Sequence, residues 1–178
     1  MIKYAALLRG IGPGNPNMQN DKLRGVFEDL GFQDVKTVIS SGNVLFSSSA
    51  KNVKKLEELI EKALPENLGF NSTTIIKSEE DLKKLAGLNP FKGMEHTAKT
   101  SLNVTFLKND PATTIKFPIR SEKGDYKVLG LFCNAICSVV DLTTGKTPNL
   151  MSWLEKEFGK QITTRTWKTV EKILKAMA

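Results

Sequence analysis

The chain has 178 residues, a formal net charge of +7 and a hydrophobic fraction of 40%, which indicate a globular protein of one domain or two small ones rather than a disordered chain. No apolar run approaches the roughly 18 residues of a membrane span. The first residues lack the pattern of a secretory signal, so we expect a cytoplasmic protein with no membrane partner.

Metal and acyl-transfer chemistry have few residues to use. Cys133 and Cys137 are the two cysteines, and their spacing fits neither a disulfide framework nor a common zinc pattern. His96 is the single histidine. We therefore expect no metal site and no cofactor.

The first half of the sequence predicts the order strand, helix, strand, strand, helix, strand. Helical spacing is shown by Leu23, Val26 and Phe27, and a hairpin is predicted around Ser41–Gly42. A capping box at 78–81 then predicts a further short helix. The six main segments are residues 2–8, 23–30, 35–40, 43–47, 53–63 and 70–77.

Between residues 87 and 99 the apolar period disappears, which predicts a linker. The second half then repeats the order of elements, with a hairpin around Asn134–Ala135 and a helix that starts at Thr147–Pro148. Its expected segments are a strand at 102–107, a short helix at 110–117, strands at 126–133 and 136–142, a helix from 147, a strand at 161–164 and a last helix from 167.

This order predicts an α+β protein made of two ferredoxin-like subdomains, each an α/β plait (βαββαβ) with an antiparallel sheet. We expect the first plait, with an extra short helix, at residues 1–86, the linker at 87–99 and the second plait, with a C-terminal helix, at 100–178.

The predicted topology places the loop after the first strand beside the turn before the third. We call residues 9–14 and 40–43 the rim. Arginine and exposed loop N–H groups suit phosphate or carboxylate, so the rim is a candidate anion site. A tight turn and ordinary loop geometry explain the same residues equally well. The candidate residues are Arg9, Gly10, Gly12, Gly14, Ser41, Gly42 and Asn43.

Several familiar motifs are absent. Gly10, Gly12 and Gly14 are spaced by two, which does not match the dinucleotide-binding fingerprint. Gly145-Lys146-Thr147 lacks the first glycine of a phosphate-binding P-loop, because Val140 stands there. The third strand reads N-V-L-F-S and also lacks the basic-Gly-aromatic run that RNA-recognition domains use to stack bases.

Three separated motifs resemble the bacterial family known as domain of unknown function 1697. They are Y-A-A-L-L-R-G-I from Tyr4, V-I-S-S-G-N-V-L-F from Val38 and T-T-R-T-W-K-T-V from Thr163. The resemblance implies a pair of α/β plaits and supplies no activity. It also singles out Arg165 as a further candidate for the anion site, and we expect Trp167 to lie in the core. Gly12–Pro13 departs from the family pattern, which has Asn-Val there.

The leading hypothesis is a cytoplasmic protein that binds an anionic ligand at the rim, either nucleic acid or a metabolite with a phosphate or carboxylate group. The 26 Lys and Arg against 19 Asp and Glu favour such a partner, although many of the lysines lie beside glutamates, as on ordinary solvated helices. The alternatives are an enzyme acting on such a metabolite at the same rim and a protein–protein interaction module. The sequence leaves the oligomeric state open.

Overall fold

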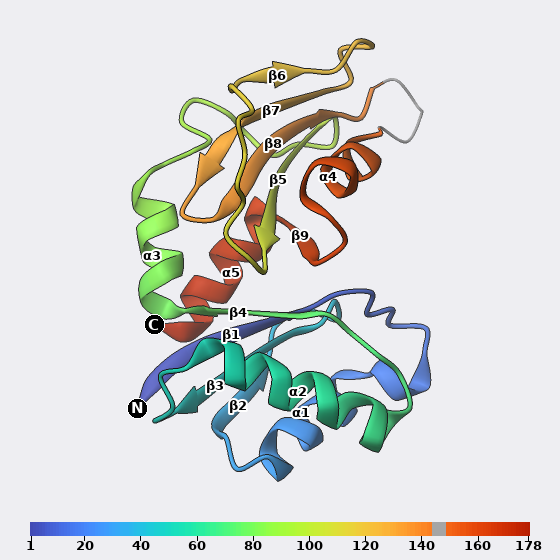
Figure 1. Ribbon diagram of the computed structural model, residues 1–178, viewed down its shortest axis with the longest axis vertical. Helices are drawn as coiled ribbons and strands as arrows, with labels where there is room; N and C mark the ends of the chain where they lie inside the picture. The colour runs from blue at the N-terminus through green and yellow to red at the C-terminus, as the bar shows by residue number, and fades with distance from the viewer. Residues whose placement is uncertain (144–148) are drawn as a thin grey trace. The chain divides into compact units, whose positions relative to one another are not determined.

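The computed structural model describes residues 1–143 and 149–178, and within them it has two antiparallel sheets and five α-helices (Figure 1). The α+β class predicted from the sequence is confirmed. The predicted helix start at Thr147–Pro148 lies outside the described residues. No helix in the described part of the chain is long and apolar enough to cross a bilayer.

Contacts between residues divide the chain into two compact units. The first comprises Met1–Leu82 with Lys172–Ala178, and the second comprises Lys83–Glu171. This division falls after Leu82, whereas the sequence-based boundaries are 1–86, a linker at 87–99 and 100–178. It also groups the last seven residues with the first unit.

The first unit is built on a four-stranded sheet in the order β2-β3-β1-β4, with all neighbours antiparallel. The first and third strands are therefore central and adjacent, as expected. Its elements are β1 (Ile2–Leu8), the 3-10 helix η1 (Pro16–Met18), α1 (Asn20–Asp29), β2 (Gln33–Thr37), β3 (Asn43–Ser48), α2 (Val53–Leu68), β4 (Thr74–Ser78) and the start of α3 (Glu79–Gly87).

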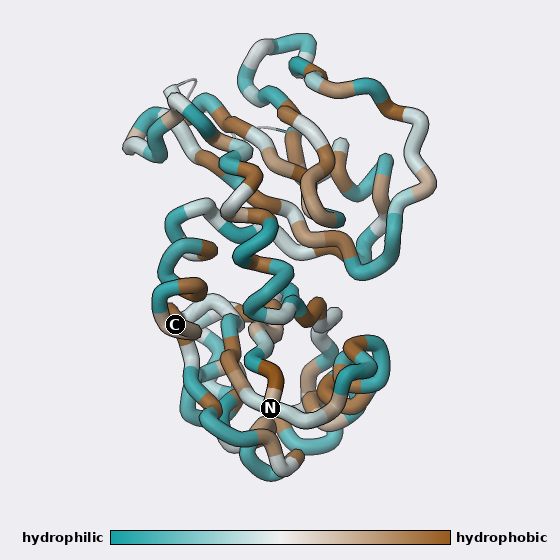
Figure 2. The backbone as a smooth tube through the Cα atoms, turned by 90° about the vertical axis from the view of Figure 1, so that its left-hand side faces the viewer, coloured by the Kyte–Doolittle hydropathy of each residue, from teal (hydrophilic) through white to brown (hydrophobic). Residues whose placement is uncertain are grey.

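Helices α1 and α2 cover one face of this sheet (Figure 1). The core between them contains the ring of Phe46, whose centroid lies 4.4 Å from that of Phe32, 5.6 Å from that of Phe27 and 5.5 Å from that of Tyr4. The Tyr4 hydroxyl reaches the end of the cluster and donates to the Ala50 carbonyl at 2.8 Å. Alternation along β1 and helical spacing in α1 thus bring these side chains onto one face. Figure 2 shows hydrophobic and hydrophilic stretches alternating along the chain.

The edge strand β4 is covered by two carboxylates of α2. Glu57 Oε1 accepts the N–H of Ile76 at 3.0 Å, and Glu61 Oε2 accepts that of Thr74 at 3.2 Å. Glu57 and Glu61 are one helical turn apart, so they reach alternate residues of the strand. Glu57 is only 5% exposed, so this contact is part of the interior.

The second unit has a five-stranded sheet in the order β6-β7-β8-β5-β9. Without the two-residue β6, this order repeats that of the first sheet. Its elements are β5 (Thr100–Leu107), β6 (Ile119–Arg120), β7 (Tyr126–Phe132), β8 (Ala135–Asp141), α4 (Leu150–Phe158), β9 (Ile162–Thr166) and the start of α5 (Trp167–Met177).

Two local predictions for this unit are wrong. Residues 110–117, expected to be a short helix, have no regular structure; the Thr113 hydroxyl accepts the N–H of Ile115 at 3.1 Å, a local bond that competes with helix formation. The hairpin turn is at Cys133–Asn134 rather than Asn134–Ala135. Both turn residues have positive φ, 47° and 61°, as a tight hairpin turn requires.

We expect the two cysteines to differ sharply in reactivity. Burial, with a smaller contribution from Cys133, raises the pKa of the Cys137 thiol to about 12, whereas Cys133 is exposed at the turn. Because the thiolate is the reactive form, a chromogenic disulfide reagent at pH 8 should modify one thiol in the native protein and two in denaturant. Two rapidly reacting native thiols would contradict this placement.

Substituting Glu57→Ala should lower the free energy of unfolding by about 1–3 kcal/mol, because it leaves the N–H of the buried Ile76 without this acceptor. Urea unfolding of the full chain measures the change. Glu58→Ala, at an exposed position on the same helix, is the matched control and should change stability by less than about 0.5 kcal/mol. Equal effects of the two substitutions would refute a role for the carboxylate at the strand edge.

Candidate functional site

The two halves of the rim lie side by side in the first unit. Leu7 of β1 pairs with Asn43 of β3, and the N–H of Leu8 donates to the Gly42 carbonyl at 2.8 Å. The loop after β1 therefore begins beside the S-S-G-N turn, at the position that the strand order predicts.

Asn43 and Ser41 hold the turn together. Asn43 is 1% exposed, and its amide nitrogen donates to the Val38 carbonyl at 2.9 Å and to Ser41 Oγ at 3.0 Å. The N–H of Val38 in turn donates to the Asn43 carbonyl at 3.0 Å. Buried in this way, the amide serves the turn rather than presenting donors to solvent.

Gly42 permits close packing between the two halves of the rim. Its φ is +78°, and a Cβ there would lie 2.6 Å from Ile11 Cγ1 and 3.1 Å from Leu8 Cβ. Both the left-handed backbone and the lack of space require glycine.

The turn contains a strained residue that the sequence pattern assigned to a strand. Ile39 has φ +60°, an unusual conformation for a β-branched residue, and its side chain is 43% exposed. Its carbonyl accepts a bond from Asn20 Nδ2 at 3.2 Å, which ties the turn to the start of α1. Sequence reasoning missed it because V-I-S reads as ordinary strand.

Arg9 lines a recess on the side of β4. The recess has a volume of about 380 Å³ and is lined by Arg9, Gly10, Glu61, Asn71, Ser72 and Thr73. The Arg9 N–H donates to the Thr73 carbonyl at 2.9 Å, and Ser72 Oγ donates to the Arg9 carbonyl at 2.7 Å. No residue of the S-S-G-N turn lines this recess. We call it the Arg9 recess.

Sequence reasoning predicted Arg9 and Gly10 as site residues but missed the other residues of the Arg9 recess, Glu61 and Asn71 to Thr73. Glu61 is the charged residue among those missed. It comes from α2, more than fifty residues after Arg9, and it also accepts the N–H of Thr74. Its helical spacing from Glu57 gave a weak signal of a shared role, but nothing in the pattern linked it to Arg9.

The remaining glycines of the loop differ in position. Gly10, with φ +77°, lies at the Arg9 recess. The Gly12 N–H donates to Met18 Sδ at 3.4 Å, and its carbonyl accepts the N–H of Asn15 at 3.1 Å, so this part of the loop folds onto itself. Gly14 is exposed and has open space around it.

Arg165 lies in the second unit, on β9, and is 8% exposed. Its Nη1 donates to Thr163 Oγ1 at 2.7 Å and to the Thr164 carbonyl at 3.0 Å. Burial lowers the pKa of Arg165 to about 10, which leaves the guanidinium charged at neutral pH. Its part in an anion site stays a prediction.

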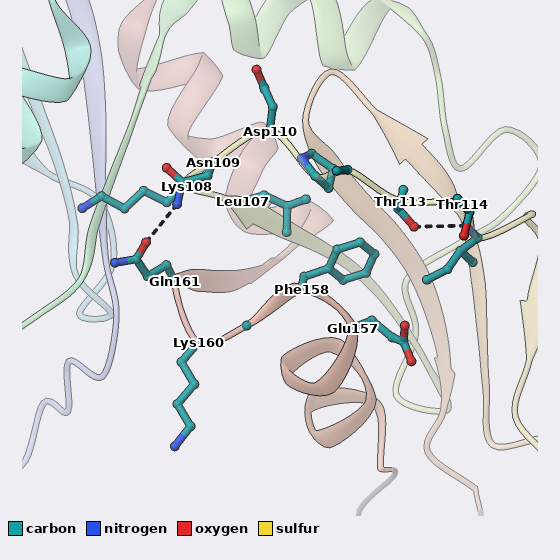
Figure 3. Close-up of a pocket in the computed structure, with 14 residues that line it drawn as sticks. Leu107, Lys108, Asn109, Asp110, Thr113, Thr114, Glu157, Phe158, Lys160 and Gln161 are labelled. Carbon is teal, nitrogen blue, oxygen red and sulfur yellow. Dashed lines mark hydrogen bonds between the residues drawn. The ribbon is translucent and has the colours of Figure 1, made fainter.

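A second pocket, of about 420 Å³, lies in the second unit between residues 107–115 and 157–161. Asn109 Nδ2 donates to Gln161 Oε1 at 2.9 Å across its edge. Figure 3 shows Lys160, Asp110 and Glu157 extending in different directions instead of converging on one point. In the described part of the chain, no group of three or more His, Cys, Asp or Glu side chains is arranged to hold a metal ion.

Two glycines with nearly the same positive φ, Gly10 and Gly42, should respond differently to substitution by alanine. Gly42→Ala adds a steric clash to an unfavourable φ and should cost about 2–4 kcal/mol of unfolding free energy. Gly10→Ala has open space and should cost about 1–2 kcal/mol. Chemical denaturation measures both, and a Gly10 variant less stable than the Gly42 variant would overturn the packing argument.

Comparison with known proteins supports the assignment of the fold. A family model described as a protein of unknown function (DUF1697) matches residues 1–130. The solved structure of a conserved bacterial protein from Streptococcus pneumoniae is similar, with 24% sequence identity, a TM-score of 0.74 and coverage of 99% of each chain. At this identity the likeness shows a shared fold. No curated protein matched. With most of its length matched by the family model, this chain belongs to the DUF1697 family of proteins of unknown function.

Proposed function

We propose that this protein binds a small ligand with a phosphate or carboxylate group in the Arg9 recess, in the cytoplasm. The observation that carries the proposal is that Arg9 and the Gly10 backbone share an open recess with the polar residues Asn71, Ser72 and Thr73. A guanidinium offers several donors in the planar arrangement that matches carboxylate and phosphate.

The position of the recess supports this proposal. The backbone of Arg9 makes two hydrogen bonds: its N–H donates to the Thr73 carbonyl, and its carbonyl accepts from Ser72 Oγ. These bonds fix the backbone from which the guanidinium extends, at the end of a central strand. Strand order and the placement of α1 and α2 support a ferredoxin-like plait for this unit. Ligand-binding side chains on such a rigid frame lose less entropy on binding.

Glu61 narrows the class of ligand. Its carboxylate lines the same recess as Arg9. A negative charge there repels a ligand that carries several negative charges and so weakens its binding. It would accept a hydrogen bond from a hydroxyl or amino group of the ligand. We therefore favour a small hydroxy acid, amino acid or sugar phosphate over nucleic acid, which needs a row of cations along its backbone. Ser41, Gly42 and Asn43 shape the neighbouring turn in this proposal and do not contact the ligand.

The proposal is tested by thermal unfolding of the full chain with a panel of hydroxy acids, amino acids and sugar phosphates. A ligand present at 100 times its Kd stabilises the native state by about 2.7 kcal/mol, or roughly 5–10 °C in Tm for a chain of this size. Arg9→Ala should abolish the shift. Arg24→Ala, which removes the same charge from an exposed position on α1, should keep it.

The outcomes separate the alternatives. A shift that survives in Arg9→Ala places binding elsewhere and refutes the proposal, as does a panel without any shift. Binding of mixed oligonucleotides that weakens steeply with salt and is lost in both arginine variants would instead support a nucleic-acid surface.

A further inference from the structure

We propose a second binding site, in the second unit, for an uncharged planar heteroaromatic ring. The site is a recess of about 490 Å³ between the segment 89–96 and the first turns of α5, and we call it the Trp167 recess. It is independent of the proposed function, since none of its residues belongs to the first unit. The lining residues are Asn89, Phe91, Lys92, Gly93, Met94, Glu95, His96, Leu102, Trp167, Lys168 and Glu171.

One wall of the Trp167 recess is aromatic. Trp167, expected in the core, is only half-buried, and its ring centroid lies 5.3 Å from that of Phe91 at an interplanar angle of 57°. Phe91 is 4% exposed and so fixes one side of the indole. A ring held on one side and open on another is a stacking platform for a planar ligand.

Met94 adds a polarisable side chain to the same recess. It is 40% exposed and lines the recess, so its thioether is accessible to a ligand there. Thioether groups make favourable contacts with aromatic rings. The segment that carries Met94, which the sequence predicts to be a linker, forms one side of a recess with Trp167.

His96 supplies a directed hydrogen-bond donor. Its Nδ1 accepts the N–H of Leu102 at 3.1 Å. A neutral imidazole that accepts at Nδ1 carries its proton on Nε2, so the second nitrogen donates. A ligand with an acceptor atom, such as the ring nitrogen or carbonyl oxygen of a heteroaromatic ring, therefore complements a recess that His96 lines.

The charged side chains balance one another. Lys92 and Lys168 line the recess together with Glu95 and Glu171, and all four are exposed. Two positive and two negative charges give no net preference for an anion or a cation. With a stacking wall and one fixed donor, this balance favours an uncharged ring. The volume lies within the roughly 300–1,000 Å³ typical of small-molecule sites.

The test uses the full chain with Trp153→Phe, so that Trp167 is the single tryptophan. Its fluorescence is titrated with adenosine, adenosine 5′-monophosphate, nicotinamide and ribose. We expect saturable quenching by adenosine or nicotinamide and none by ribose. Quenching by adenosine alone would show that the site prefers a nucleoside. Quenching by nicotinamide alone would show that it prefers a smaller ring. The phosphate of the monophosphate should change the Kd less than about threefold.

Matched variants locate the site. Met94→Ala should weaken binding several-fold, whereas Met151→Ala, which alters a methionine of similar exposure outside the recess, should leave it unchanged. His96→Phe should weaken binding about tenfold through loss of the donor, with native circular dichroism as the check on folding. The proposal fails if neither ring compound quenches, if the phosphate tightens binding tenfold or more, or if the two methionine variants behave alike.

Discussion

The pairing of β1 with β3 and β4 is the constraint on which the rim depends. Because β1 is central, successive residues at its end bond to opposite sides: the Leu8 N–H to Gly42 on the β3 side, and the Arg9 N–H to Thr73 on the β4 side. This alternation separates the two parts of the predicted anion site. The S-S-G-N turn supports the loop through close packing at Gly42, while Arg9 lines a recess with residues that precede β4.

Much of the first unit could be predicted from the sequence, because its signals are local. The order of elements could be predicted from local patterns such as the helical spacing of Leu23, Val26 and Phe27 and the strand pattern of residues 2–8. That order correctly predicted that the loop after β1 lies beside the S-S-G-N turn. The contribution of Glu61 could not be predicted, since it depends on how α2 crosses the edge strand. The role of Asn43 was also hidden. In the sequence, an amide at the start of a strand is a candidate ligand contact, and only its burial and hydrogen bonds show that it closes the turn.

The second unit shows where weak local signals mislead. Its sheet repeats the strand order of the first, but residues 110–117, in the place corresponding to α1, form no helix. The Thr113 hydroxyl accepts a local hydrogen bond there, which competes with helical hydrogen bonds. Sequence periodicity could not predict that Arg165 is buried or that Trp167 is partly exposed. Periodicity indicates which face of a helix or strand a residue lies on, but not how completely neighbouring segments cover that face.

The two α2 carboxylates that cover β4 also affect whether the first sheet can pair with another chain. A strand added at this edge would need the N–H groups of Thr74 and Ile76, and it would have to displace Glu57 and Glu61 to reach them. The opposite edge, β2, carries a register irregularity and exposed charged residues, which also hinder a regular ladder. Addition of a strand from a neighbouring molecule is therefore disfavoured at both edges of this sheet. The helix that completes the core is thus also a safeguard against aggregation.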